Sequence, residues 1–421
     1  MRSLSDLIQN IASPQEITSA AQRLRQPNER KDLTTDQVLD LFERWAGALD
    51  EGEVRQIPGV TFLRLWLRRG TLEPLLAREL GAEWLRGRWR EDGRVRLRAF
   101  PVGIVGHWPA GNIEIQPVLS LTCALLGGNN CVVRLPGGLV EPTRLIVEKL
   151  KAADPTGLLT GRMFLASFDH SRLDLHEAMA RAVDGAMIWG GEESVLQVRA
   201  LPFPHWARVV VFGPRLSVAA MDAGTWTDRQ ECKSWCRRIA RDVWQFEQQA
   251  CSSPQTLFLE RDGAADPAEF VAELKLAFEE ESRAHPRLEI EPALTSAICR
   301  ARASWLLDDI ANRAFFPQSA DWTILQGRGA EIPEPTQGRT LSVLLADDLL
   351  DAISKFDGSV QTLGLAVKDA SKEEVLAEAA GRRGVDRVVR LGQMHVFGSP
   401  WDGTDLVRPM MRLVRHTRSQ D

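Results

Sequence analysis

The chain has 421 residues and contains no tyrosine. Tyrosine is therefore unavailable as an acid, base or nucleophile, which excludes the Tyr/Lys chemistry of the short-chain dehydrogenases. Cysteine is also sparse, with six residues in the whole chain, and so low a content argues against a disulfide framework. We expect reduced thiols and a cytoplasmic protein.

Charge and hydropathy exclude further classes of protein. The formal net charge is −5, with no strong block of either sign, so composition gives no electrostatic reason to expect nucleic acid or an anionic membrane as a partner. No apolar run approaches the ~20 residues that span a bilayer. The N-terminal segment "MRSLSDLIQNIASPQ" also lacks the long apolar core of a signal peptide.

Length and pattern predict an α/β protein of two or three domains. The first ~95 residues have apolar positions at helical spacing, and Thr34 with Gln37 forms a capping box at one helix start. Beyond them, short apolar segments alternate with helical ones, which is typical of βαβ units around a parallel sheet. One long helix is expected over residues 230–249. The pattern changes near residue 215, which gives segments 1–215, 216–395 and 396–421.

Several familiar site motifs are missing from the sequence. There is no G-x-G-x-x-G, no phosphate-binding Walker loop, no H-E-x-x-H and no G-x-S-x-G. Cys232 and Cys236 are four residues apart on an expected helix, but no second cysteine or histidine pair accompanies them. Core packing is therefore the favoured interpretation of this pair, and no metal site is predicted.

Two short segments remain as candidate binding loops. "GHWPAGN" follows an apolar strand and would place His107 and Asn112 in a turn rich in Gly and Pro. It could be a plain surface turn, or it could line a cleft with the Asn112 amide donating to an oxyanion. "WGGEES" places Gly190 and Gly191 between a strand and a helix, where backbone N–H groups can hold a pyrophosphate.

A single cysteine is the candidate nucleophile. Cys251 lies in "EQQACSSPQT", between a helix-like run and a strand-like run, and its neighbours are polar. A thiolate is a strong nucleophile near neutral pH when it is accessible. An arbitrary cysteine is more often a buried structural residue, so this pattern alone leaves both interpretations open.

Taken in order, "HWPAGN", "ALLGGNNCVVRL", "MIWGGEESV" and "FEQQACSSPQTLFLE" resemble the bacterial acyl-CoA reductases of the luminescence type (LuxC-like). These enzymes are a branch of the aldehyde dehydrogenase superfamily. The segments "QTLGL" and "GVDRVVRLGQM" are similar too, and the resemblance covers roughly residues 95–415. It implies an aldehyde dehydrogenase-like α/β fold with two parallel-sheet domains and a small oligomerisation element.

The resemblance also assigns roles to the three segments and to single residues. Residues 1–215 would hold the N-terminal helices and the NAD(P)-binding domain, 216–395 the catalytic domain, and 396–421 would return to the cofactor domain or an oligomer interface. Cys251 would be the nucleophile, with Asn112 completing the oxyanion site. The implied cofactor-binding residues are His107, Trp108, Pro109, Arg134, Trp189, Gly190 and Gly191.

Two departures from the superfamily pattern refine this reading. Hydrolytic aldehyde dehydrogenases carry a glutamate base in a stretch that corresponds here to "RVVVFGPRLS", which has no carboxylate. A thioester on Cys251 would then lack a base to activate water. Arg134 replaces the usual lysine, and no acidic residue follows it before Glu141. Because arginine accommodates a 2′-phosphate, NADPH is the expected cofactor, with NADH as the alternative.

The expected function is therefore the NADPH-dependent reduction of an acyl-CoA to the aldehyde through an acyl-Cys251 intermediate. One alternative is a reductase or dehydrogenase of the same superfamily that acts on another activated acyl group or an aldehyde. Another is a non-catalytic, partner-binding subunit. The resemblance implies a homo-oligomer, built through "RVRLRAFPV" or the residues after 395, and an acyl-activating synthetase as a possible protein partner.

Overall fold

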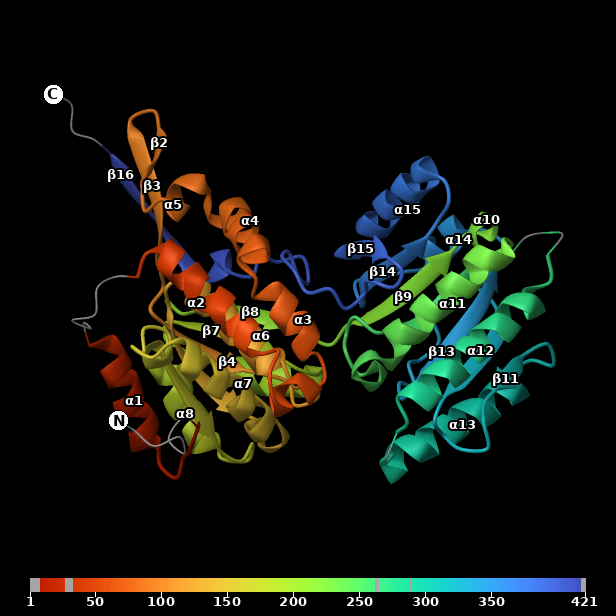
Figure 1. Cartoon of the computed structure of the whole chain (residues 1–421), viewed down its shortest axis with the longest axis horizontal. Helices are drawn as coiled ribbons and strands as arrows, with labels where there is room; N and C mark the ends of the chain where they lie inside the picture. Colours follow the sequence, from red (N-terminus) through yellow and green to blue (C-terminus); the bar gives the residue numbers. More distant parts are fainter. Residues whose placement is uncertain (1–7, 27–32, 262, 264, 288, 418–421) are drawn as a thin grey trace. The chain divides into compact units, whose positions relative to one another are not determined.

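A computed structural model describes residues 8–26, 33–261, 263, 265–287 and 289–417 (Figure 1). The first seven residues of the segment examined for a signal peptide lie outside the described part. The chain forms two compact units. Unit 1 contains the residues up to Gly213 and those from Phe397 onward, and unit 2 is Pro214–Val396. The sequence placed the corresponding limits at residues 215 and 395.

Unit 1 is built around a six-stranded parallel sheet with the strand order β1-β6-β5-β4-β7-β8. Its strands and helices, and the 3-10 helices η2, η3, η4 and η6, are β1 (Ile8–Asn10), α1 (Pro14–Arg25), α2 (Thr35–Ala48), η2 (Glu53–Gln56), α3 (Val60–Trp66), α4 (Arg69–Leu80), α5 (Ala82–Leu85), β2 (Arg90–Asp92), β3 (Val95–Pro101), β4 (Ile104–Trp108), α6 (Gln116–Leu126), β5 (Asn130–Leu135), η3 (Gly137–Leu139), α7 (Val140–Ala153), η4 (Thr160–Arg162), β6 (Met163–Ser167), α8 (Leu173–Ala182), β7 (Gly185–Trp189), α9 (Glu192–Arg199), β8 (Arg208–Phe212), η6 (Arg408–Met410) and β16 (Met411–Thr417).

The strand order reverses at β4 in the middle of this sheet. The chain passes from β4 to β5 and β6 on one side, and then returns to place β7 and β8 on the other. In open parallel sheets, ligands bind at the carboxyl ends of the strands where the order reverses. The segments directly after β4 and β7 are therefore the natural binding edge of unit 1.

A three-stranded antiparallel sheet in the order β16-β3-β2 completes unit 1. Strands β3 and β16 pair along their length, from Met411 opposite Pro101 to Thr417 opposite Val95. The two segments proposed from sequence as the oligomerisation element therefore contribute to one small sheet (Figure 1). Its role in assembly stays a prediction.

Unit 2 contains a seven-stranded sheet with the order β11-β12-β13-β10-β9-β14-β15, parallel except for the β11–β12 pair. Its elements are β9 (Leu216–Met221), α10 (Ala223–Trp226), α11 (Arg229–Trp244), η5 (Gln245–Gln248), β10 (Pro254–Glu260), α12 (Pro267–Ala284), α13 (Pro292–Asp308), β11 (Arg313–Phe315), β12 (Thr323–Arg328), β13 (Thr340–Ala346), α14 (Leu349–Ser354), β14 (Val360–Ala366), α15 (Ala370–Arg382) and β15 (Arg387–Arg390).

Both faces of the unit 2 sheet are covered by helices. Ala219 of β9 belongs to an apolar core with α11 and α12, whereas Val218 and Ala220 belong to a second core with α14 and α15. Successive side chains of a strand point to opposite faces, so a strand buried on both sides reads as a continuous apolar run. The predicted α/β class with two parallel-sheet domains is confirmed.

Two expectations about single elements were wrong. The helix expected over residues 230–249 ends at Trp244, because Phe246, Glu247 and Gln248 all have positive φ, at 55°, 53° and 61°. The helical first ~95 residues also include strand β1, which pairs with β6 at the sheet edge. Three residues are too few to show an alternating pattern, so this strand left no signal in the sequence.

Within the described residues, every helix is too short or too polar to cross a bilayer.

Candidate active site

Cys251 lies on the short loop between η5 and β10 in unit 2, and it is half-buried. The loop reaches the amino-terminal ends of β9 and β14, because Ser217 and Gln361 at those ends both contact Cys251. The thiol is thus placed at one edge of the parallel sheet, outside both apolar cores. This arrangement suits a reactive cysteine better than a packing residue.

The turn before the loop is held in an unfavourable backbone conformation. Left-handed φ angles cost roughly 1–2 kcal/mol per non-glycine residue, and here three such residues follow one another. The buried side chain of Gln248 offsets this cost by donating to the carbonyls of Pro254 and Thr340, both at 2.8 Å. Its Oε1 accepts from Thr340 N at 2.7 Å. Strained backbone fixed by its surroundings is typical of functional loops.

Cys251 is held at both its backbone and its sulfur. Ser217 Oγ donates to the Cys251 carbonyl at 2.6 Å, and Gln361 Nε2 donates to Sγ at 3.3 Å. Neighbouring Ser252 is 3.0 Å from Nδ1 of buried His395. Each of these contacts joins residues that are far apart in the chain, so local sequence patterns gave no signal for Ser217, Gln361 or His395.

Two buried ionisable groups lie behind this loop. Burial lowers the pKa of His395 to about 4 and raises the pKa of Asp242 to about 7. His395 is therefore neutral near pH 7, and its Nε2 lies 2.7 Å from the Asp242 carbonyl. With Nε2 as the donor, Nδ1 accepts the Ser252 hydroxyl. His395 thus orients the residue next to Cys251.

In unit 1 the structure corrects the predicted position of His107 and Trp108. Both are buried within strand β4, and the turn begins only after it, at Pro109. His107 Nδ1 is 2.8 Å from Ser120 Oγ, and burial lowers the pKa of His107 to about 3. Trp108 Nε1 donates to His176 Nδ1 at 3.0 Å. A strand that is buried on both faces lacks the alternation of apolar and polar residues that marks a half-buried strand. The sequence pattern therefore placed His107 in the turn.

The other predicted residues of unit 1 follow the strands at the binding edge. Asn112 lies in the loop between β4 and α6. Trp189 ends β7, stacks on Phe212 with ring centroids 3.7 Å apart, and donates to Ser120 Oγ at 2.9 Å. A joint role of Asn112 in unit 1 and Cys251 in unit 2 stays a prediction.

The two predicted glycines differ in what they can offer a ligand. Gly190 N–H is already bonded to the Phe212 carbonyl at 3.2 Å, so it extends the β7–β8 pairing. Gly191 is the N-cap of α9. A Cβ added at Gly191 would meet no protein atom within 4 Å, so packing alone does not require glycine there. Close approach of a ligand phosphate to a helix start would require it.

Arg134 lies near the end of β5 and is partly buried. Its Nη2 donates to the Phe168 carbonyl at 3.2 Å, and its guanidinium lies 5.8 Å from the Phe168 ring centroid. Within the described chain, its buried Nε has no hydrogen-bond partner. Burial lowers the pKa of this guanidinium.

Gln116, at the first turn of α6, is a further polar residue at this edge that sequence reasoning missed. In the described part of the chain, neither atom of its buried amide has a partner, and the same holds for His107 Nε2. Buried polar atoms are nearly always satisfied in folded proteins. These atoms, with Arg134 Nε and the open space at Gly191, therefore fit a polar ligand such as a dinucleotide.

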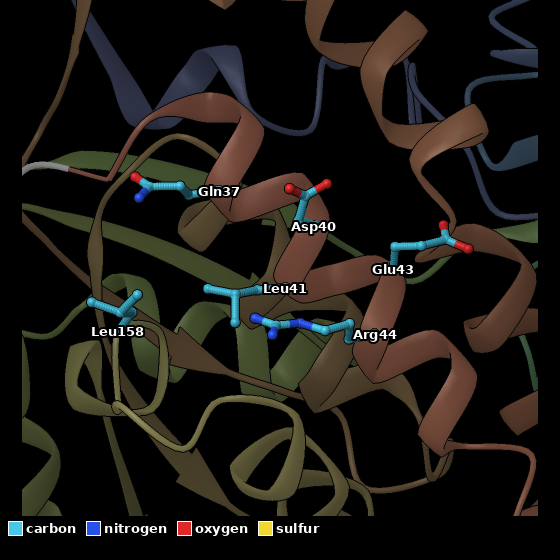
Figure 2. A pocket seen from close by; sticks show the side chains of 6 residues that line it. All are labelled: Gln37, Asp40, Leu41, Glu43, Arg44 and Leu158. Carbon is cyan, nitrogen blue, oxygen red and sulfur yellow. The ribbon is translucent and has the colours of Figure 1, made fainter.

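A separate cavity of about 470 Å³ lies beside α2 and is lined by Gln37, Asp40, Leu41, Glu43, Arg44 and Leu158 (Figure 2). Its two carboxylates are already engaged, since Asp40 accepts from Arg69 Nη1 at 2.8 Å and Glu43 from Arg68 Nη1 at 2.5 Å. These ion pairs tie α2 to the start of α4. The cavity contains none of the predicted site residues, and we assign it no role in catalysis.

No grouping of three or more His, Cys, Asp or Glu side chains suited to a metal ion occurs among the described residues. Cys232 and Cys236 have their sulfurs 4.0 Å apart and belong to the apolar core under α11. Their placement agrees with the core packing expected from the sequence.

Comparison with solved structures defines the class of the fold as that of the aldehyde dehydrogenases. The chain is similar to indole-3-acetaldehyde dehydrogenase complexed with NAD+ (TM-score 0.72, 15% identity, 96% of this chain and 90% of that one). It is also similar to an NADP-dependent glyceraldehyde-3-phosphate dehydrogenase from Bacillus halodurans (TM-score 0.71, 15% identity, 96% and 92% covered). At such identities the likeness shows the fold alone.

Sequence comparison then identifies the family. Residues 21–416 match the model of the family described as "Acyl-CoA reductase (LuxC)", and the chain belongs to this family of acyl reductases. It is similar to the long-chain acyl-protein thioester reductase of Vibrio harveyi, with 24% identity over 354 residues, 82% of this chain and 70% of the relative. The Photorhabdus luminescens protein of the same name is 24% identical over 359 residues, covering 83% and 70%. The family and fold inferred from sequence are confirmed.

Proposed function

We propose that this protein reduces a long-chain acyl thioester, with acyl-CoA as the donor, to the aldehyde through a covalent acyl group on Cys251. The observation that carries the proposal is the placement of Cys251: a half-buried thiol outside the cores, fixed by donors to its carbonyl and its sulfur. Membership of the acyl reductase family supports the reaction class.

In the proposed first step, the Cys251 thiolate attacks the carbonyl carbon of the thioester. The bond from that carbon to the CoA sulfur then breaks, CoA leaves as the thiolate, and the acyl group is bound to Cys251 Sγ. The Asn112 amide and the Cys251 backbone N–H are the proposed donors to the oxyanion. Loss of one such donor typically raises the barrier by ~3–4 kcal/mol.

The acyl-enzyme must resist water until reduction. The stretch "RVVVFGPRLS", which comprises β8, the connection to β9 and the first two residues of β9, carries no carboxylate. In unit 2, Glu247 is bound to arginines, and buried Asp242 accepts from Gly392 N at 2.6 Å. Both carboxylates are thus engaged by other groups, and a base needs a free lone pair to activate water, which supports transfer of the acyl group to hydride rather than hydrolysis.

A nicotinamide cofactor, when bound, would supply a hydride to the carbonyl carbon of the acyl group. The bond from that carbon to Cys251 Sγ then breaks with its electron pair left on sulfur, which releases the aldehyde and regenerates the Cys251 thiolate. The residues proposed to hold it are those at the carboxyl edge of the unit 1 sheet, with Gln116 added. Arg134 would face a 2′-phosphate, which favours NADPH over NADH. The structural neighbours crystallised with NAD+ and NADP support a nicotinamide cofactor in general terms.

The curated relatives are named for acyl-protein thioesters, whereas the family is named for acyl-CoA. Both donors present the same reacting group, a thioester carbonyl. A transient acyl-protein donor, such as an acyl-activating synthetase, is therefore compatible with the same chemistry. That partner, the homo-oligomer and the cytoplasmic location stay predictions.

The test uses radiolabelled long-chain acyl-CoA with Cys251→Ala and the matched control Cys299→Ala, which removes the exposed cysteine on α13. We expect the first variant to lose both acyl labelling and aldehyde formation, and the control to retain both. Aldehyde production by Cys251→Ala would refute the covalent route. Labelling from an acyl-protein donor but not from acyl-CoA would correct the donor only.

A further inference from the structure

The hydrogen bond from Gln361 to the cysteine sulfur depends on a defect in the sheet. Strand β9 pairs with β10 on one side and β14 on the other, and both pairings shift register beside Ser217. The shifts leave one extra residue in each neighbour, Gln255 in β10 and Gln361 in β14. Bulges re-aim side chains at strand ends, and here each bulge carries a buried glutamine.

The bulge in β14 brings two consecutive side chains together. In a regular strand, neighbouring side chains point to opposite faces and do not meet. Thr362 Oγ1 nevertheless lies 3.3 Å from Gln361 Oε1 and donates to it. This bond fixes the orientation of the amide, so that its NH₂ group is the end that faces Cys251 Sγ at 3.3 Å.

The hydroxyl of Thr362 is itself oriented by a cation on the next strand. Arg387 of β15 is the register partner of Thr362, and its Nη1 donates to Thr362 Oγ1 at 3.0 Å. Arg387 Nη2 is held by the carbonyls of Met394 and Val396 at 3.3 and 3.1 Å. Every bond in the sequence Arg387, Thr362, Gln361, Cys251 therefore runs in one direction, with the sulfur as the final acceptor.

We propose that Arg387, Thr362 and Gln361 form a donor relay that stabilises the Cys251 thiolate. Hydrogen bonds in a chain polarise one another, and a donor aimed at the charged form of a group favours that form. Gln361 and Thr362 are fully buried, so solvent screens these contacts little. The relay rests on the proposed function, because it supplies the reactive form of the nucleophile.

Other ionisable groups around the loop are already committed elsewhere. Arg215 pairs with Asp386 at 2.5 Å beside β14, and Glu247 pairs with arginines beyond η5. His395, with its pKa lowered to about 4 by burial, is neutral near pH 7. Asp242 titrates close to neutrality. The effect of the relay is therefore taken as the difference in titration midpoint between variant and wild type, and not from a single pH profile.

The experiment follows alkylation of Cys251 by iodoacetamide against pH in the full chain, with the Cys251 peptide quantified by mass spectrometry. For Gln361→Leu we expect the midpoint to rise by about one pH unit, which corresponds to about tenfold slower alkylation below the midpoint. Thr362→Val should shift it in the same direction by less. Thr362→Ser keeps the hydroxyl and should retain the wild-type midpoint.

Gln255→Leu is the matched control for disturbance of the loop. This glutamine holds the carbonyls of Gln248 and Ser253 at 3.2 and 3.3 Å, whereas the donor to the sulfur is Gln361. An equal shift in Gln255→Leu, or no shift in Gln361→Leu, would overturn the relay. If Gln361→Leu fails to fold, equal midpoints in Thr362→Val and Thr362→Ser would overturn it. Failure of acyl labelling would instead refute the proposed function, because alkylation requires no acyl substrate.

Discussion

Glu247 Oε1 accepts a hydrogen bond from Arg339 Nη2 at 2.5 Å, across 92 residues of sequence. The same carboxylate binds Arg287, and Arg339 also pairs with Asp321 at 2.9 Å and lies over the ring of Trp244. The Arg339 side chain is only 2% exposed. The Glu247 carboxylate, on the strained turn before Cys251, thus neutralises the buried Arg339 cation. This pairing helps to maintain the left-handed backbone of the turn.

Substitution Glu247→Ala should therefore destabilise unit 2. Removing one partner of a buried ion pair is destabilising, but Arg339 keeps its pair with Asp321 and Glu247 is 42% exposed, so we expect a reduced loss of roughly 1–2 kcal/mol. The measurement is the free energy of unfolding in urea. Glu280→Ala is the control, since its pair with Arg237 is about half exposed on both sides. Equal unfolding midpoints for the two variants would mean that the network does not hold the turn.

The buried carboxyl of Asp242 predicts a specific dependence of stability on pH. Its folded pKa is about 7 against an ordinary value of 3.8, so the folded chain binds the proton more tightly than the unfolded chain. Its contribution to stability is therefore complete below pH 3.8 and is lost as the pH rises through about 7.

We expect Asp242→Asn to remove that decline, because asparagine stays neutral. The free energy of unfolding of the wild type minus that of the variant should fall by at most about 1.4 kcal/mol per pH unit between these pKa values. His395, with a pKa lowered to about 4, makes the free energy of unfolding change with pH in the opposite direction. Because both proteins contain His395, this effect largely cancels in the difference. A difference that does not change with pH would show that Asp242 is ionised in the folded protein.

The sheets of this protein could be predicted because their strands are buried on both faces. Segments such as "PQTLFLE" and "QTLGLAVKD" read as apolar runs between helices, and they became β10 and β14. Strand β1 could not be predicted, since its three residues are defined by pairing with β6. The end of α11 was missed for a similar reason: the positive φ angles at Phe246 to Gln248 are imposed by distant partners such as Thr340.

The candidate site likewise contains some residues that could be predicted from the sequence and others that could not. Cys251, Asn112 and Arg134 stood out because their segments resemble a family, and the polar neighbours of Cys251 marked a loop. Gln361 contacts the sulfur from 110 residues away. Ser217 is 34 residues from Cys251, and His395 is 143 residues from Ser252. Nothing in the surrounding sequence shows that this glutamine of a buried strand contacts Cys251, because the contact depends on the bulge.

The cofactor preference gives the last prediction, at Arg134. A charged donor to a phosphate contributes roughly 1.5–3 kcal/mol, and the Arg134 guanidinium has a buried Nε without a partner in the described chain. Arg134→Leu should therefore raise the KM for NADPH by about tenfold or more, while the KM for NADH changes little.

Arg172→Leu is the matched control for this substitution in the same unit. Arg172 pairs with Asp174 at 2.8 Å at the start of α8, and we expect its loss to leave both KM values unchanged. Steady-state rates with each cofactor at saturating acyl-CoA give the comparison. An equal rise in KM for NADH and NADPH in Arg134→Leu would contradict a 2′-phosphate contact. It would show instead that Arg134 supports the binding edge through its bond to the Phe168 carbonyl.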